Sequence, residues 1–152
     1  MTRFYESGSR ALLEHGGLLG QIAGDEVMAL FVPGLATAAY RRKAVQAGRA
    51  LLDALGYGSP DGNWVEVGVG IASGEEFVGN VAGGGYKDFT AIGDVTNTAA
   101  RLTSVAKSGE MIVDEESFAA VADLYPQAEP RELELKGKQA PVKSYSIRIE
   151  QG

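Results

Sequence analysis

Apolar and polar positions alternate with two different periods along the chain, and each change of period predicts a new element. Two segments repeat apolar residues with the spacing of one helix face, residues 3–17 and 40–58, and residues 97–107 form a third predicted helix. Residues 64–72 alternate strictly instead, so Val65, Val67, Val69 and Ile71 share one face of a half-buried strand. The chain therefore mixes helices and strands.

The first two helices carry an apolar stripe that marks their buried face. In residues 3–17, Gly16 and Gly17 end the helix, and the stripe consists of Phe4, Ala11, Leu12 and His15. In residues 40–58 the stripe comprises Ala44, Ala47, Gly48, Leu51 and Leu55. Both helices are expected to pack one face on the rest of the domain.

Short apolar runs separated by turn residues predict the other strands. Residues 18–34 form two strands around a tight turn at Gly24–Asp25, and residues 77–92 form a glycine-rich hairpin. Residues 109–125 give a strand and a short helix with Asp114 as its N-cap, and residues 131–150 give two strands around a loop. Strands interleaved with helices indicate an α/β or α+β sandwich with helices packed on a sheet.

Composition narrows the class of protein. The chain has 152 residues, which favours a single domain over residues 1–152. Its net charge of −6 argues against a nucleic-acid partner, although one or two local cations suffice for a small phosphate ligand. The lack of cysteine excludes disulfides and thiol nucleophiles, and a single histidine argues against a histidine-rich metal site. No apolar run reaches about 18 residues and no leader pattern is present, so we expect a cytoplasmic protein without membrane contact.

Asp25 is the first candidate for chemistry. Two apolar strands flank it, so its carboxylate would project from a rigid tip and could ligate a hard cation such as Mg²⁺. Gly-Asp pairs also favour turns for steric reasons alone, and a plain hairpin turn is therefore the alternative.

Asn97 and Arg101 are the second candidate. Four positions apart on a predicted helix, they lie on one face, and the alanines between them would let the helix approach a sheet or a partner. An amide and a guanidinium can together hold a ribose and a polyphosphate, and a guanidinium suits charge that builds on a transferring phosphoryl group. The alternative is an asparagine that caps the helix N-terminus, with a solvated arginine one turn later.

Glycine is in excess, with 21 residues, and several glycine-bearing segments are candidates for phosphate loops. The segment GVGIASG at residues 68–74 has the wrong spacing for a dinucleotide fingerprint and lies within the alternating strand, which excludes a Rossmann interpretation. The segment GGGYK, with Gly83–Gly85, could cradle a phosphate or form a hairpin tip. The segment LKGKQ places Lys136 and Lys138 on a loop, as a cationic arm over phosphates or as a charged edge.

The order of these motifs resembles the class III nucleotidyl cyclases, that is, the adenylate/guanylate cyclase catalytic domain. The segment GGLLGQIAGDEVMALF is similar to the family's hairpin of two strands around Gly-Asp. The segment VEVGVGIASGEEFVGNVAG is similar to its next strand and the following glycines, and DFTAIGDVTNTAARL to its purine and transition-state segment. The segments GEMIVDEESF and LELKGKQAPVKSYSI are similar to the family's closing elements. The resemblance therefore runs from about residue 10 to residue 149.

The resemblance implies a fold, an assembly and a set of site residues. The fold would be α+β and ferredoxin-like, with a mixed, mostly antiparallel sheet and helices packed on one side of it. Members of the family work as head-to-tail dimers with active sites in the groove between subunits. The matching positions are Asp25 for the second metal-binding aspartate, Thr90 for a purine-reading residue, Asn97 for the ribose, Arg101 for the transition state, and Lys136, with Lys138 as the alternative, for the triphosphate.

The implied reaction is attack of the ribose 3′-hydroxyl of ATP on the α-phosphorus, which gives 3′,5′-cyclic AMP and pyrophosphate for signal transduction. Two metal ions, Mg²⁺ or Mn²⁺, would activate the hydroxyl and neutralise the phosphates. ATP is therefore the expected small-molecule partner, and GTP is the alternative substrate.

The chain departs from the family pattern in three places. No motif like Asp-Ile-x-Gly-Phe-Thr, which carries the first metal aspartate, precedes Arg3, so the two-metal site is incomplete and the sheet is expected to lack its first, central strand. The purine-reading lysine falls on Gln21, and because glutamine both donates and accepts, Gln21 with Thr90 would tolerate adenine or guanine. Thr96 and Thr98 stand where apolar residues are usual, and we expect a modest change in packing there.

Two other hypotheses remain open at this point. The missing aspartate supports a cyclase-like module that binds nucleotide, or only dimerises, without turnover. The third hypothesis is an unrelated α+β sandwich whose turns mimic these motifs.

Overall fold

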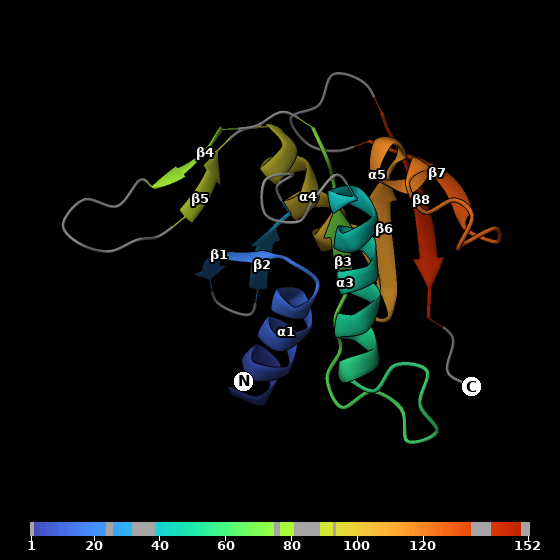
Figure 1. Cartoon of the computed structure of the whole chain (residues 1–152). Helices are drawn as coiled ribbons and strands as arrows, with labels where there is room; N and C mark the ends of the chain where they lie inside the picture. Colours follow the sequence, from blue (N-terminus) through green and yellow to red (C-terminus); the bar gives the residue numbers. More distant parts are fainter. Residues whose placement is uncertain are drawn as a thin grey trace.

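A computed structural model describes residues 2–23, 26–31, 39–74, 77–80, 89–92, 94–134 and 141–149 of the chain. In this part the predicted mixture of helices and strands is confirmed (Figure 1). The helices are α1 (Thr2–Glu14), α3 (Tyr40–Ala54), α4 (Asp94–Val105) and α5 (Glu115–Ala119). The strands are β1 (Leu18–Ala23), β2 (Glu26–Leu30), β3 (Val69–Ile71), β4 (Phe77–Asn80), β5 (Phe89–Ile92), β6 (Glu110–Asp114), β7 (Glu129–Leu133) and β8 (Val142–Arg148). Among these described helices, none combines the length and the apolar character that crossing a membrane requires.

The described strands form three sheets. β1 pairs with β2 and β4 with β5 in antiparallel hairpins, and the other strands form a four-stranded sheet in the order β3-β6-β8-β7. Only β3 and β6 run parallel in that sheet, so it is mixed and mostly antiparallel, as predicted. Among the described strands β2 pairs only with β1, and β3 pairs only with β6. Figure 1 shows the β4–β5 hairpin standing out from the body of the domain.

The larger apolar core lies between α3 and one face of the four-stranded sheet. A Cβ atom added at Gly48 of α3 would lie 2.9 Å from the Met111 sulfur and 3.3 Å from Ile71 Cδ1, so this helix approaches β6 and β3 closely. The core continues around the helix with buried residues that include Phe4, Val45, Leu51, Leu52, Leu55, Val113, Val121 and Ile147.

The predicted stripe of α3 was incomplete. Ala44 is only partly buried, whereas Val45 and Leu52 are fully buried. The buried face is wider than one stripe because α1 packs on a second side of the helix, where Gly8 approaches the end of the Leu51 side chain.

α4 covers the opposite face of the sheet. Val69 and Ile71 of β3 point toward α3, so Gly70 between them points the other way. A Cβ atom at Gly70 would lie 2.5 Å from the Ala99 carbonyl oxygen and 2.6 Å from the Thr103 hydroxyl oxygen, both in α4. The expectation that the helices pack on one side of the sheet is therefore wrong, because glycine leaves room for a second helical layer.

The same face of β3 continues with small residues. A Cβ atom at Gly68 would lie 2.8 Å from Ala106, just past the end of α4, and one at Gly74 would lie 2.9 Å from Val95 Cγ2 in its first turn. The glycines of GVGIASG therefore serve close packing along the whole helix. A smaller second core lies here, formed by Leu102 and Ile112 with Ala72, Ala106, Leu133 and Val142 packed against them.

β3 is shorter than the predicted strand. Val65 and Val67 still pack against the larger core, and the Val67 carbonyl oxygen accepts a hydrogen bond from the Gly109 N–H at 2.9 Å, next to β6. The Tyr57 hydroxyl donates to the Val65 carbonyl oxygen at 3.1 Å and accepts from the Val67 N–H at 2.9 Å. The buried Tyr57 hydroxyl thus links the backbone groups of two residues that precede β3.

Gly16 ends the first helix and Asp114 caps α5 as predicted, whereas α3 ends at Ala54 instead of residue 58 and α4 begins at Asp94 instead of Asn97. At the end of α1, His15 Nδ1 bonds to the Ala11 carbonyl oxygen at 2.8 Å, and Gly16 takes a φ of 87°, a conformation that favours glycine. Asp114 caps α5, because its carboxylate accepts a hydrogen bond from the Ser117 N–H at 2.9 Å.

Replacing Gly70 with alanine should lower the free energy of unfolding by about 3 kcal/mol, because the new methyl group would overlap backbone atoms of α4 that cannot move unless the helix shifts. Urea unfolding followed by circular dichroism measures the change. Gly8→Ala is the control, since its methyl group would meet only the end of the Leu51 side chain, at 3.1 Å, and alanine raises helix propensity. A Gly70→Ala protein as stable as the parent would contradict the close contact between α4 and β3.

Candidate functional site

α4 carries both residues of the Asn97–Arg101 pair. The helix begins at Asp94, so Asn97, three positions later, lies inside it. The alternative that Asn97 caps the helix is therefore wrong, because a capping residue precedes the first helical turn. Asn97 is exposed, and Arg101, one turn later on the same face, is partly buried.

The opposite face of α4 holds the helix on the sheet. Thr98 and Leu102 are buried, and Ala99 lies against Gly70 of β3. With about 100° of rotation per residue, Asn97 points almost directly away from this buried face, and Arg101 lies about 40° round the helix from Asn97. The pair is therefore presented to the outside of the domain.

Neither side chain of the pair is engaged within the described part of the chain. No hydrogen bond or ion pair there involves the Asn97 amide or the Arg101 guanidinium. Arg41, in comparison, lies 2.8 Å from a carboxylate oxygen of Glu116. Arg101 is therefore a cation that an anionic ligand could approach without displacing a described carboxylate.

The strands that carry the two predicted purine-reading residues lie next to each other. Thr90 is in β5, where it stands opposite Gly79 of β4 in the register. Gln21 is in β1, and β1 contacts β5. The two backbone positions therefore belong to neighbouring strands.

β1 contains an irregularity at Gln21 that sequence reasoning missed. The pairing of β1 with β2 shifts by one residue between Leu19 and Ile22, so that Gly20 and Gln21 together oppose Met28. Such a β-bulge re-aims a side chain and is over-represented next to active sites. The sequence signal is Leu-Leu-Gly-Gln-Ile-Ala, whose adjacent apolar pairs break strict alternation.

The other predicted site residues lie outside the described residues, namely Asp25, Gly83–Gly85, Lys136 and Lys138. Within the described ranges, no group of three or more His, Cys, Asp or Glu side chains is arranged to hold a metal ion. The metal role of Asp25 and the nucleotide role of Lys136 therefore stay predictions.

Glu110, at the start of β6, is a buried ionisable group that sequence reasoning missed. It accepts hydrogen bonds from the Ser146 hydroxyl and, at 2.9 Å, from the Lys107 backbone N–H just past α4. Arg131 Nη1 and Arg148 Nε lie 3.4 and 3.7 Å from its Oε2. Burial alone raises the pKa of Glu110. The hydrogen bonds and the two arginine charges together lower it by a larger amount, so the pKa lies below its ordinary value of 4.5. An ionised Glu110 thus ties the end of α4 to β7 and β8.

Comparison with known proteins identifies the class of domain. Residues 21–148 match the adenylate and guanylate cyclase catalytic domain family, and the chain belongs to that family. Two uncharacterized proteins of Mycobacterium tuberculosis are among its relatives. Rv1319c is 32% identical over 108 residues, or 71% of this chain, and Rv1318c is 29% identical over 133 residues, or 85% of this chain. These stretches are 20% and 24% of the two relatives, so the chain spans less than a quarter of their length.

Solved cyclase structures share the fold. The guanylyl cyclase Cya2 matches with a TM-score of 0.82 and 22% identity, over 99% of this chain and 79% of that chain. The adenylyl cyclase CyaB from P. aeruginosa matches with a TM-score of 0.75 and 24% identity, over 99% and 83% of the two chains. The guanylate cyclase domain of RhGC from Catenaria anguillulae, in complex with GTP, matches with a TM-score of 0.78 and 16% identity, over 99% and 82%. At these identities the likeness establishes the fold.

Glu110→Gln should lower the free energy of unfolding by about 2 kcal/mol at pH 7, because a neutral amide loses the charge-assisted bonds to its partners. A lowered pKa means that folding favours the ionised form, so this stability is present above the unfolded pKa near 4.5 and is lost as pH falls through the lower folded pKa. The difference between parent and variant should therefore shrink from pH 7 to about pH 3 in urea unfolding experiments.

Glu129→Gln is the matched control, because Glu129 also lies 3.4 Å from Arg131 but is largely exposed. We expect a change below about 0.5 kcal/mol for this control. A difference between parent and Glu110→Gln that stays constant with pH would contradict an ionised Glu110.

Proposed function

We propose that this chain is the catalytic part of a nucleotidyl cyclase that converts ATP, or alternatively GTP, into the 3′,5′-cyclic nucleotide and pyrophosphate. The observation that carries the proposal is the Asn97–Arg101 pair, an amide and a guanidinium side by side on the outward face of α4 and unengaged within the described part of the chain. Membership of the cyclase catalytic-domain family supplies the class of reaction. The pair supplies groups for the ribose and the phosphates.

In the proposed reaction the ribose 3′-hydroxyl attacks the α-phosphorus, and pyrophosphate leaves. Asn97 orients the ribose, because its amide can both donate to and accept from sugar oxygens. Arg101 donates to the phosphate oxygens on which charge builds, and an interaction of this kind that strengthens in the transition state raises kcat. Lys136 holds the triphosphate as a point charge.

Gln21 and Thr90 read the base from the neighbouring strands β1 and β5. A glutamine amide and a threonine hydroxyl each donate and accept, so the pair suits the edge of adenine or of guanine. This chemistry is the reason for keeping both ATP and GTP as substrates.

Asp25 offers the hard carboxylate oxygen that Mg²⁺ and Mn²⁺ prefer, and the substrate phosphates supply further oxygen ligands. A bound ion would neutralise phosphate charge and favour ionisation of the attacking hydroxyl. One aspartate does not complete the two-ion site that the family resemblance implies, so we derive no step through a second ion. We propose that residues 1–152 form a single cyclase domain.

A head-to-tail homodimer completes the proposed site. Asn97 and Arg101 point away from the sheet on which their own helix packs, so the wall that faces them has to come from another surface. In a two-fold assembly each groove combines Asn97 and Arg101 of one copy with Asp25 of the other.

Arg101→Ala should lower kcat for cyclic nucleotide formation about 100-fold or more, because it removes a donor to the transition state. The assay measures cyclic AMP from ATP and cyclic GMP from GTP, each with Mg²⁺ and with Mn²⁺. The melting temperature of the Arg101→Ala variant should stay within about 2 °C of that of the parent, since the Arg101 guanidinium contacts no described carboxylate. Arg10→Ala is the control, an exposed arginine of α1 that likewise has no ion pair among the described residues, and it should keep full activity.

A parent chain that forms no cyclic nucleotide under any of these four conditions would refute turnover. Titration calorimetry with ATP and GTP would then decide whether the chain is a binding module. A large drop in melting temperature for Arg101→Ala would instead assign that residue to the fold.

Mixing Asp25→Ala with Arg101→Ala should restore activity that neither variant has alone. Half of the randomly assembled dimers contain one of each, and each such dimer has one intact groove, so we expect about a quarter of the parent activity. Titrating one variant into the other at fixed total protein measures the recovery. Mixtures that stay as inactive as their components would contradict a composite site.

A further inference from the structure

A polar cluster lies where the parallel strands β3 and β6 finish. It consists of Ser73, Asp114, Ser117 and Arg41, and we call it the Ser73 cluster. The Ser73 backbone N–H donates to Asp114 Oδ2 at 3.1 Å, and the Ser117 backbone N–H donates to Asp114 Oδ1 at 2.9 Å. One carboxylate therefore joins Ser73, two positions past the end of β3, to the first turn of α5.

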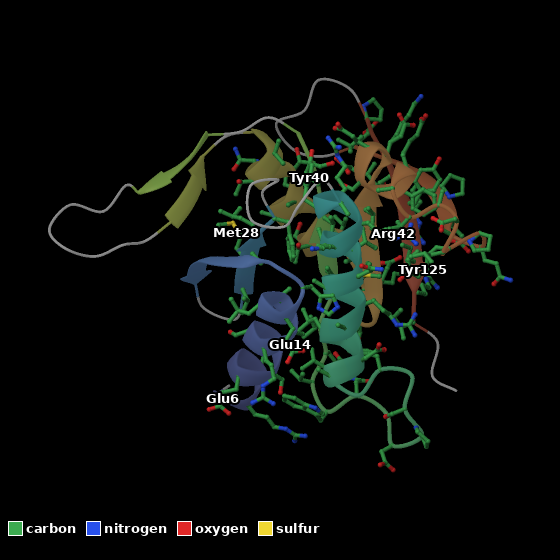
Figure 2. All side chains as sticks on the ribbon, viewed as in Figure 1. Glu6, Glu14, Met28, Tyr40, Arg42 and Tyr125 are labelled. Atoms are coloured by element: carbon green, nitrogen blue, oxygen red, sulfur yellow. The ribbon has the colours of Figure 1, made fainter. Side chains whose placement is uncertain are left out.

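The Ser73 side chain contacts one residue of α5 and one residue of α3. Ser73 Oγ lies 2.7 Å from Ser117 Oγ and accepts a hydrogen bond from Arg41 Nε at 3.3 Å. Arg41 lies at the N-terminal end of α3, which Tyr40 and Arg42 mark in Figure 2. Ser73 is thus held, through its backbone and its side chain, by α3, β6 and α5.

Gly74, the residue after Ser73, contacts α4. A Cβ atom at Gly74 would lie 2.9 Å from Val95 Cγ2, so Gly74 and the first turn of α4 are in close contact. The chain leaves Gly74 toward the β4–β5 hairpin and returns from it to α4 at Asp94. Val95, in the first turn of α4 and two residues before Asn97, therefore packs against Gly74.

We propose that the Ser73 cluster positions Asn97 and Arg101: it fixes Gly74, and through Val95 it fixes the first turn of α4. Its kinetic consequence rests on the proposed cyclase function, whereas its effect on α4 does not. The competing explanation is that the cluster only stabilises the fold, as satisfied polar networks do in general.

Ser73→Ala separates the two explanations, because it removes the contacts to Ser117 and Arg41 and keeps the backbone bond to Asp114. Ser59→Ala is the matched control, since Ser59 Oγ donates one bond of 2.7 Å to the Gly56 carbonyl oxygen in the loop after α3. We expect amide hydrogen exchange in residues 94–105 to become about tenfold faster in Ser73→Ala and to stay unchanged in α1. Ser59→Ala should leave α4 unchanged.

Turnover gives a second readout that a loss of stability does not produce. Ser73→Ala should lower kcat about tenfold with KM for ATP within about twofold, because a misplaced Arg101 weakens contacts to the transition state. In a background that carries both Asn97→Ala and Arg101→Ala, the same substitution should have almost no further effect on kcat, since both groups that the cluster positions are already gone.

Unchanged exchange in α4, or equal acceleration in α1 and α4, overturns the proposal whether or not the chain turns over nucleotide. A tenfold loss of kcat that persists in the background carrying both Asn97→Ala and Arg101→Ala overturns it as well. A parent chain without turnover refutes the cyclase function instead, and hydrogen exchange in α4 then decides the positioning role alone.

Discussion

The close contact between the backbone of α4 and the glycines of β3 is the constraint on which the rest of the domain depends. At Gly70 a single methyl group would stand 2.5 Å from the carbonyl oxygen of Ala99. Close packing of this kind leaves the helix no room to roll or slide, because either motion drives helix atoms into the strand. The outward face of α4 is fixed in the same way, and it is the face that carries Asn97 and Arg101. A reacting site needs such rigidity, since misplacement by about 1 Å can cost roughly a hundredfold in rate.

The same constraint makes the two faces of the sheet chemically different. Toward α3 the strands present large apolar side chains, among them Val69, Ile71, Met111 and Val113. Toward α4, glycine lets the helix lie directly on β3, and the neighbouring strands bury Glu110 and Ser146. Buried polar groups are tolerated only where they are bonded, and within the described part of the chain no buried side-chain nitrogen or oxygen lacks a partner. The charge on Glu110 persists there because two arginines and two hydrogen-bond donors surround it.

Sequence periodicity was sufficient to predict the elements and insufficient to predict how they pack. A period identifies the residues that share a face but not the neighbour that covers it, so the second layer formed by α4 was missed. The start of α4 was ambiguous because Asp94 and Asn97 are both cap-forming residue types, and only the backbone shows that the helix begins at the first of them. The bulge at Gln21 depends on its pairing with another strand. The roles of Gln21, Thr90 and Lys136 came from family resemblance, because no spacing rule assigns a base or a phosphate to such residues.

The exposure of α4 limits what one copy of this chain can do alone. In water an exposed ion pair contributes only about 0–1 kcal/mol, whereas the same pair in a dry site contributes several times more. For the proposed reaction the outward face of α4 therefore has to be covered, and a second copy can cover it with a surface that brings Asp25. Activity and assembly are then linked by mass action, so turnover per chain should depend on protein concentration. The proposed role of the Ser73 cluster would also favour assembly. If the cluster holds the outward face of α4 in place, that face loses less conformational entropy when a second copy binds.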